Sequence, residues 1–229
     1  MNLSGDYYLN FHAHQQEPGE DEIVIQSQFL QQNFTMQSDG KIFYTAGLHP
    51  WHADQLSLDQ IEKKLEKLIS EKKIIAIGEA GLDKLKGVKW ETQLQVLKKH
   101  IEISEKLQLP LVIHSVKAHN EILKLKKDTR AKSNWVIHNF TGSKQMAMDF
   151  IDHGFYLSIG HHIKNDNSRI NHFFHQLPKD KIFLETDDFD ISIKELYRAA
   201  AEKWNVGMET LKLQLISNLQ EFLKNKNPG

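Results

Sequence analysis

The amino-acid sequence predicts an α/β protein in which strands and helices alternate around a (β/α)8 barrel, also called a TIM barrel. Two observations carry this prediction: eight short apolar runs recur along the 229 residues, and helical patterns separate most of them. A doubly wound open sheet is the alternative. No Gly-rich phosphate loop follows the first run, and this absence disfavours the open sheet.

The eight runs are nearly continuously apolar and rich in Ile, Val, Phe and Tyr. Such runs are typical of parallel strands that are covered on both faces. The predicted strands are Tyr7–His12, Ile23–Gln28, Ile42–Leu48, Ile74–Gly78, Leu111–His114, Trp135–Asn139, Phe155–Ile159 and Ile182–Glu185. The interval between the second and third strands is short for a crossover helix, so we expect the barrel to be distorted there.

Apolar residues at helical spacing predict helices between several of these strands. One stripe covers residues 58–69, with Glu and Lys on the opposite face, and a second covers residues 94–107. Pro110 stands just before the fifth strand, where a helix cannot continue. Residues 193–223 close the chain with a helical pattern that is interrupted at Gly207.

The composition is that of a soluble globular protein, with 40% hydrophobic residues, 26% charged residues and a net charge of −1. No run approaches 18 consecutive apolar residues, and Met1–Asp6 has neither the basic nor the apolar part of a signal peptide. We therefore expect a cytoplasmic protein with one domain over residues 1–229, no membrane association and no obligate protein partner.

Histidine and cysteine contents bear directly on the possible chemistry. The chain has no Cys, which excludes disulfides, thiolate zinc sites, iron–sulfur clusters and a Cys nucleophile. It has 13 His, more than its 12 Gly. A histidine-rich chain without cysteine raises the question of a metal site built from nitrogen and oxygen ligands.

Histidines stand at the carboxyl ends of three predicted strands, where the side chains of a barrel converge on its active site. The first strand ends in His12-Ala13-His14, and alternation along a strand puts both rings on one face. The fifth and sixth strands end at His114 and His138. Taken alone, each could be an ordinary polar strand end or a hydrogen-bonded core histidine.

Carboxylates end two further strands. Glu79 follows the fourth apolar run, and an acid placed there is costly to bury unless it is paired or bound to metal. The eighth run ends in Glu185-Thr186-Asp187, where alternation points Glu185 and Asp187 the same way, with Asp187 further toward the mouth. The alternative for this acidic cluster is that it caps the following helix.

The strand ends together supply four imidazoles and two carboxylates: His12, His14, His114, His138, Glu79 and Asp187. Ligation by nitrogen and oxygen suits Zn²⁺, Mn²⁺, Co²⁺ or Mg²⁺. Six ligands are too many for one catalytic zinc with an open position, and they suit two ions that share a carboxylate. His49 lies in a Gly- and Pro-containing turn that presents its ring at the barrel mouth.

With these residues assembled, the sequence resembles the TatD family of metal-dependent hydrolases along nearly its whole length. The resemblance rests on His12-Ala13-His14, Gly47-Leu48-His49-Pro50, Gly78-Glu79-Ala80-Gly81-Leu82-Asp83, Leu109-Pro110-Leu111-Val112-Ile113-His114-Ser115, His138-Asn139-Phe140-Thr141-Gly142-Ser143 and Glu185-Thr186-Asp187. By this resemblance, one ion is held by His12, His14, Glu79 and Asp187, and the other by Glu79, His114 and His138. His49 matches a family histidine at the substrate end of the site.

The resemblance implies a hydrolase, and the best-known family members are deoxyribonucleases acting on phosphodiester bonds. Two departures from the family pattern concern positions beside the ligands. Asn10 stands where the family usually has Asp, and Val116-Lys117 stand where it commonly carries Arg. We therefore take Lys117, with His49, as a candidate for binding substrate oxygens, and DNA or a small phosphoester as the expected substrate.

The mechanism we expect is hydrolysis by a metal-activated water at a two-metal centre. Asp187 is the candidate for orienting that water and accepting its proton, and Glu79 is the second catalytic carboxylate. The first alternative keeps the metals and changes the substrate to an amide, a lactone or a deaminase substrate. The second is a non-catalytic barrel that binds metal or a partner.

Overall fold

In the computed structural model, described for residues 5–37 and 40–224, eight parallel strands hydrogen-bond in sequence order. The strands are β1 (Tyr8–Ala13), β2 (Glu22–Phe29), β3 (Ile42–Gly47), β4 (Ala76–Asp83), β5 (Leu111–Val116), β6 (Trp135–Ile137), β7 (Phe155–Ile159) and β8 (Ile182–Leu184). All eight predicted strands are present, and their order is that of a (β/α)8 fold.

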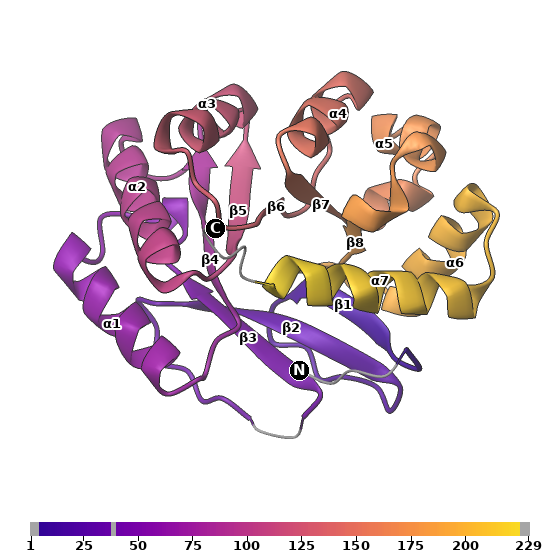
Figure 1. The fold of residues 1–229 in the computed structure, drawn as a ribbon, viewed down its shortest axis with the longest axis horizontal. Coiled ribbons are helices and arrows are strands. Elements are labelled where there is room, and N and C mark those ends of the chain that lie inside the picture. The colour runs from indigo at the N-terminus through magenta and orange to yellow at the C-terminus, as the bar shows by residue number, and fades with distance from the viewer. Residues whose placement is uncertain (1–4, 38–39, 225–229) are drawn as a thin grey trace. The chain divides into compact units, whose positions relative to one another are not determined.

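Helices follow β3 to β8 in the chain (Figure 1). The α-helices are α1 (Leu58–Ser70), α2 (Trp90–Leu107), α3 (His119–Thr129), α4 (Lys144–Asp152), α5 (Arg169–Phe173), α6 (Ile193–Trp204) and α7 (Met208–Leu223). The 3-10 helices are η1 (Pro50–His52), η2 (His161–Lys164), η3 (Phe174–Gln176) and η4 (Lys179–Lys181). Between β2 and β3 no described residue is helical, as the short interval predicts, and the β1–β2 connection also lacks a helix.

The chain divides into two compact units whose segments alternate along the sequence. Unit 1 comprises the described residues of Met1–Gln26, Ser38–Ile42 and His138–Phe222, and unit 2 those of Ser27–Gln37, Phe43–Ile137 and Leu223–Gly229. The expectation of one domain over residues 1–229 stays a prediction.

Unit 1 is built around an aromatic core. Phe11 of β1 stacks on Phe183 of β8 with ring centroids 4.0 Å apart, and Phe222 of α7 meets Phe11 edge-to-face at 5.5 Å. Tyr197 of α6, fully buried, receives the N–H of Leu9 on its hydroxyl at 2.9 Å. These contacts hold β1 beside β8, so the ends of both strands are fixed together.

Unit 2 contains β3 to β6 and the helices α1 to α3. Ser57 and Gln60 form a capping box that begins α1, and Gln108 ends α2 in the left-handed conformation shortly before Pro110. β4 is longer than predicted because Ala80–Asp83 continue to pair with β5, from Ala80 with Ile113 to Asp83 with Val116. Glu79 therefore lies inside a strand and not at its end.

Close approach of main chains beside Glu79 requires glycine at Gly47. A Cβ atom added to Gly47 would lie 2.5 Å from the carbonyl oxygen of Glu79, a distance that real Cβ contacts do not reach. β3 and β4 can therefore run this close only with glycine at this position. Gly47, the first residue of the Gly-Leu-His-Pro motif, thus packs directly against Gly78 and Glu79 of the Gly-Glu motif.

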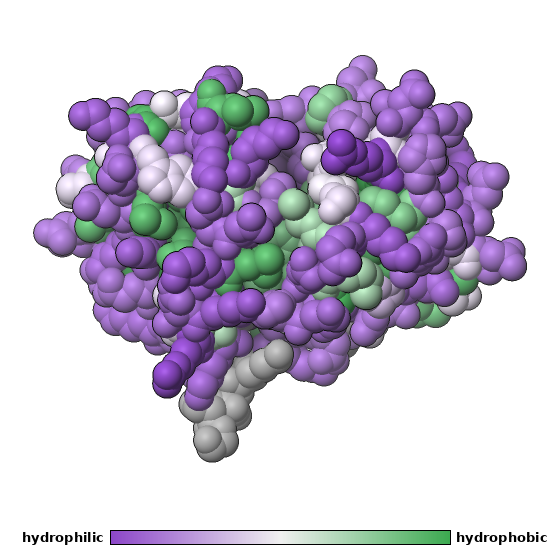
Figure 2. All heavy atoms as spheres, turned by 90° about the horizontal axis from the view of Figure 1, so that it is seen from above, coloured by the Kyte–Doolittle hydropathy of each residue, from purple (hydrophilic) through white to green (hydrophobic). Residues whose placement is uncertain are grey.

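The surface is predominantly hydrophilic in the face shown in Figure 2, where hydrophobic residues appear as separate patches. Among the described residues, none of the helices is both long enough and apolar enough to cross a membrane. Two of the exposed large hydrophobic residues, Trp51 and Leu85, belong to unit 2 and lie near the loop that follows β4.

Candidate metal-binding site

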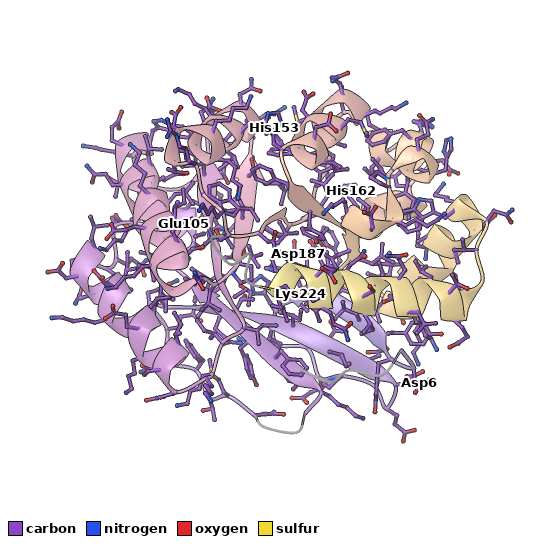
Figure 3. All side chains as sticks on the ribbon, viewed as in Figure 1. Asp6, Glu105, His153, His162, Asp187 and Lys224 are labelled. Atoms are coloured by element: carbon purple, nitrogen blue, oxygen red, sulfur yellow. The ribbon has the colours of Figure 1, made fainter. Side chains whose placement is uncertain are left out.

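Unit 1 brings His12, His14 and Asp187 to one place at the ends of β1 and β8. The main chain fixes this arrangement, because the N–H of Asp187 donates to the carbonyl of His12 at 3.0 Å and Ala13 pairs with Asp187 as a parallel bridge. His12 is buried, whereas His14 and Asp187 are partly exposed. Figure 3 labels Asp187, which lies just beyond β8. The two imidazoles predicted to share one strand face do meet the same carboxylate.

Distances within this group suit ligation of a common cation. Asp187 Oδ1 lies 3.8 Å from Nε2 of His12 and 3.6 Å from Nε2 of His14. Both distances exceed that of a normal N–H···O hydrogen bond. They are close to the edge of a tetrahedron with bonds of about 2.1 Å, which is roughly 3.4 Å. The nitrogen and oxygen donors of this group therefore fit a divalent cation in both spacing and chemistry.

A second group in unit 1 surrounds Asn139, the residue after His138. Its backbone N–H donates to Glu185 Oε1 at 2.7 Å, and its side-chain Nδ2 donates to Asp187 Oδ2 at 2.9 Å. Glu185 Oε1 lies 3.4 Å from His138 Nδ1. Glu185 is fully buried, and its Oε2 has no hydrogen-bond partner among the described residues. An ionised carboxylate oxygen buried in this way is costly unless a cation or proton compensates it.

Backbone strain marks the two residues that follow the strands here. Asn139 has φ +43° and Asp187 has φ +53°. Both values lie in the left-handed region, which residues other than glycine seldom occupy. Lys117 in unit 2, directly after β5, has φ +55°. Strained residues that are held by their surroundings are often found at functional sites. At Asp187 the left-handed turn accompanies the arrangement in which Oδ1 faces the histidines and Oδ2 faces Asn139.

Unit 2 contains its own cluster of His49, Glu79 and His114. Glu79 Oε1 lies 2.6 Å from His114 Nδ1 and 3.2 Å from His49 Nε2, and the two histidine nitrogens are 3.3 Å apart. His49 Nδ1 accepts the N–H of Trp51 at 3.2 Å, so the proton of a neutral His49 ring is on Nε2, which faces Glu79. The cluster combines two imidazoles with one buried carboxylate, a donor set that suits a transition-metal ion, although His49 was predicted as a substrate-binding residue and not as a ligand.

Asp83, at the end of β4, contacts this cluster through Trp51 and His114. Its Oδ2 accepts the indole N–H of Trp51 at 2.7 Å and lies 3.6 Å from His114 Nε2. Burial alone would raise the pKa of Asp83, but the nearby His114 ring and hydrogen bonds from Trp51 and two backbone N–H groups hold that pKa well below its ordinary value. Asp83 is thus an ionised carboxylate beside His114, and it restrains both His114 and Trp51.

His49 is positioned by a buried histidine of α2. His100 Nε2 accepts the N–H of Leu48 at 3.1 Å, and His100 Nδ1 donates to the carbonyl of Val96 at 2.8 Å. Burial lowers the pKa of His100 to about 4, so the ring is neutral at pH 7 and can accept the Leu48 N–H. His100 is thus a buried packing residue that anchors the turn carrying His49.

The predicted site residues thus fall into two groups within the units. His12, His14, His138 and Asp187 belong to unit 1, and His49, Glu79 and His114 to unit 2. Lys117 is exposed in the turn between β5 and α3. Its role in substrate binding stays a prediction, as do the roles of the other residues.

Sequence reasoning left out residues that contact the predicted ligands: Glu185, Asn139, Asp83 and Trp51. A signal existed for Glu185, because it is an acid at the end of an apolar run, the feature that singled out Glu79. Asp83 carried the same signal once β4 is known to continue to it. The contacts of Asn139 and Trp51 depend on turn geometry, which residue spacing alone does not reveal.

Comparison with known proteins gives a consistent family. The family model described as TatD related DNase matches residues 25–224. The chain is 29% identical over 158 residues, 66% of its length, to the uncharacterized metal-dependent hydrolase YjjV of Escherichia coli, covering 60% of that protein. It is 28% identical over 147 residues to the 3'-5' ssDNA/RNA exonuclease TatD of Salmonella typhimurium, covering 62% of this chain and 56% of that protein. The matches thus span about three fifths of these relatives' length.

The structural match covers a larger share of the chain than the sequence matches do. The crystal structure of the E. coli TatD homolog YjjV superposes with a TM-score of 0.79, covering 96% of this chain and 98% of that one at 19% identity. This likeness confirms the TIM-barrel fold class predicted from the alternation of strands and helices. Since the family model covers most of the chain, the protein belongs to the TatD family of metal-dependent hydrolases.

Proposed function

We propose that this protein is a divalent-metal-dependent phosphodiesterase that hydrolyses nucleic acid, with DNA as the expected polymer. The observation that carries the proposal is the set of His and carboxylate clusters within the two units, each with its ligand atoms within 4.8 Å of one another. Membership of a family described as TatD related DNase supports the phosphodiester as the bond that is cleaved. A relative named as a 3'-5' ssDNA/RNA exonuclease supports a nucleic-acid substrate.

The proposed centre holds two divalent cations, Zn²⁺, Mn²⁺, Mg²⁺ or Co²⁺. By the family resemblance, His12, His14 and Asp187 would bind one ion, and His114 and His138 the other, with Glu79 shared between them. Divalent cations bound there would lower the pKa of a water molecule and stabilise negative charge on the phosphate. The spacing of Asp187 Oδ1 from His12 and His14 supports the first half of this assignment.

Asp187 is the residue we assign to proton transfer. Its Oδ2 is held by the Asn139 amide at 2.9 Å, so the carboxylate has one fixed orientation. Its Oδ1 faces the two histidines and is the atom placed to orient a water and accept its proton. Glu79, whose Oε1 is close to both His49 and His114, is the second catalytic carboxylate of the proposal.

His49 and Lys117 are proposed to bind substrate oxygens. His49 presents an Nε2–H, because its Nδ1 accepts the backbone N–H of Trp51. That N–H now lies beside Glu79 and can donate to a phosphate oxygen that enters between them. Lys117 is exposed and carries a positive charge on a flexible stem, which suits a phosphate contact without bidentate geometry.

The deciding experiment measures hydrolysis of a single-stranded oligodeoxynucleotide by protein treated with EDTA and then supplied with Mn²⁺ or Mg²⁺. We expect no hydrolysis in EDTA and full recovery with metal. Asp187→Asn should reduce kcat by about 10²-fold or more, because the proton acceptor is lost. Asp188→Asn is the matched control, since Asp188 is the next residue and is exposed.

Failure of the metal-loaded protein to cleave any oligonucleotide would overturn the proposal. A parallel panel of amide, lactone and deaminase substrates identifies the alternative chemistry. Turnover of one of those substrates without phosphodiester cleavage would assign the same residues to a different bond. Metal binding with no turnover of any substrate would indicate a non-catalytic protein.

A further inference from the structure

The loop that follows β4 forms one wall of a cavity in unit 2. The cavity has a volume of about 600 Å³ and is lined by Asp83, Lys84, Lys86, Trp90, Gln93 and Glu121, among other residues. Asp83 is shared with the His49–Glu79–His114 cluster, because its Oδ2 lies 3.6 Å from His114 Nε2. The cavity therefore begins one residue away from the proposed catalytic groups of unit 2.

Two lysines that line this cavity each lie over a tryptophan ring, Trp90 in the lining and Trp51 beside it. Lys86 Nζ lies 3.4 Å from the centre of the Trp51 ring, and Lys84 Nζ lies 5.3 Å from the centre of the Trp90 ring. Trp51 is 38% exposed, although its indole N–H is held by Asp83. Lys86 lies over one face of this indole, so a nucleobase would stack there once the flexible lysine side chain moves aside.

The local charge favours an anionic ligand. Lys84, Lys86 and Lys89 stand within six residues of one another, while Asp83 and Glu121 of the lining return two negative charges and Glu121 pairs with Lys84. The positive charge offered to a ligand therefore comes chiefly from the exposed Lys86 and Lys89. Lys86 is exposed and lies over the indole, from which its flexible stem can move to a phosphate. Cationic and aromatic side chains interleaved in this way are typical of surfaces that bind single-stranded nucleic acid.

The loop is also firmly attached to the proposed catalytic cluster. Asp83 Oδ1 accepts the backbone N–H groups of Leu85 and Lys86 at 2.8 and 3.0 Å. Gln93 ties the loop to α2, because its side chain bonds to both the N–H and the C=O of Asp83 and to the carbonyl of Val88. A strand bound on this loop would thus be held at a fixed position relative to His114.

We propose that Trp51, Lys84 and Lys86 form a nucleotide subsite for single-stranded nucleic acid, beside the phosphodiester that is cleaved. Trp51 stacks on one base of the strand, and the two lysines neutralise a flanking phosphate. Duplex DNA is excluded from this mode because its bases are already stacked on one another. This inference rests on the proposed nuclease function and assigns the residues that bind one base and one flanking phosphate of the strand.

The test measures binding without catalysis, by fluorescence anisotropy of a labelled oligothymidylate in EDTA. Trp51→Ala should weaken binding about tenfold through loss of stacking, and Trp51→Phe should restore most of the affinity. Lys86→Ala should reduce the slope of log K against log salt by about 0.7, the value for one phosphate contact on a single strand. Lys124→Ala, an exposed lysine on α3, is the matched control and should leave affinity and slope unchanged.

Hydrolysis of the same oligonucleotide with Mn²⁺ separates the two proposals. If the wild-type protein cleaves it, and the Trp51 and Lys86 variants bind as tightly as wild type, the subsite is wrong and the nuclease function stands. If the variants bind more weakly and metal-loaded wild type cleaves no oligonucleotide, the subsite stands and the function is wrong. Equal affinity of the wild type for duplex and single strand would also overturn the subsite. Lys86→Ala alters an exposed side chain and keeps the test valid should Trp51→Ala fail to fold.

Discussion

Two hydrogen bonds join Asn10 of β1 to Thr186, which follows β8. Asn10 Nδ2 donates to Thr186 Oγ1 at 2.8 Å, and Asn10 Oδ1 accepts the backbone N–H of Thr186 at 3.0 Å. Both residues are buried, and Gln16 Oε1 accepts from each of them. The residue immediately before Asp187 is therefore fixed from β1. In this chain an amide side chain performs this role.

Replacing Asn10 by Ala should destabilise the protein and weaken metal binding together. The buried N–H of Thr186 would lose its acceptor, which costs about 1–3 kcal/mol in unfolding free energy. Because Asp187 would lose support, metal affinity should fall about tenfold. Urea unfolding in EDTA measures the first quantity and calorimetric titration with Mn²⁺ the second. Asn33→Ala, at an exposed position, is the control, and unchanged metal affinity in Asn10→Ala would contradict the positioning role.

Glu185→Gln should raise the stability of the metal-free protein and lower its affinity for a divalent cation. The amide oxygen of Gln can still accept the Asn139 N–H, while removal of a buried charge should raise the unfolding free energy in EDTA. The same loss of charge should weaken binding of a divalent cation about tenfold or more. Unchanged stability of the metal-free variant together with wild-type metal affinity would show that Glu185 serves only as a backbone acceptor.

Added metal should raise the melting temperature of the EDTA-treated protein. At a free Mn²⁺ concentration 100 times its dissociation constant, binding adds about 2.7 kcal/mol, which corresponds to roughly 5–10 °C for a chain of this size. His14→Ala should diminish the shift, because His14 Nε2 is one of the two nitrogens facing Asp187. His172→Ala, at an exposed position on α5, should leave it unchanged. An equal shift in both variants would contradict ligation by His14.

Stability should fall between pH 7 and pH 5 because of His100. Its pKa is about 4 in the folded protein and near the ordinary 6.5 in the unfolded chain, so in this interval the unfolded chain binds the extra proton. The contribution of His100 is complete above pH 6.5 and is lost as the pH falls toward 4, with about 2 kcal/mol lost by pH 5. Urea unfolding of wild type and His100→Gln at both pH values isolates this effect. The pH dependence should be smaller in the variant, and an identical dependence would contradict it.

The strands could be predicted because each is buried on both faces and therefore reads as a continuous apolar run. The prediction ended β4 too early because Gly78 and Glu79 interrupt the apolar run, whereas pairing with β5 continues to Asp83. The helix-free connection between β1 and β2 was not predicted, although the interval between Ala13 and Glu22 is even shorter than that between Phe29 and Ile42. Chain length therefore carried a signal before β2 that the prediction did not use.

The candidate ligands could be predicted in part because histidine is conspicuous at a strand end. Their neighbours could not, since they act through backbone geometry. Asn139 bonds to Glu185 and Asp187 only because its own backbone is left-handed, and Trp51 reaches Asp83 only through the turn at Pro50. Such contacts depend on the backbone conformation of the folded chain, which residue type and spacing alone do not specify.

The alternation of the two units along the chain has a consequence for synthesis. β1 lies near the N-terminus, and its partner β8, which carries Asp187, belongs to the segment His138–Phe222 of the same unit. His12 and His14 are therefore synthesised well before Asp187, whose carboxylate lies beside them in the folded protein. Contacts of such long sequence separation form late and slowly. Until they form, His12 and His14 lack the carboxylate of Asp187, so this cluster is complete only after the segment that carries β8 and Asp187 has been synthesised and has paired with β1.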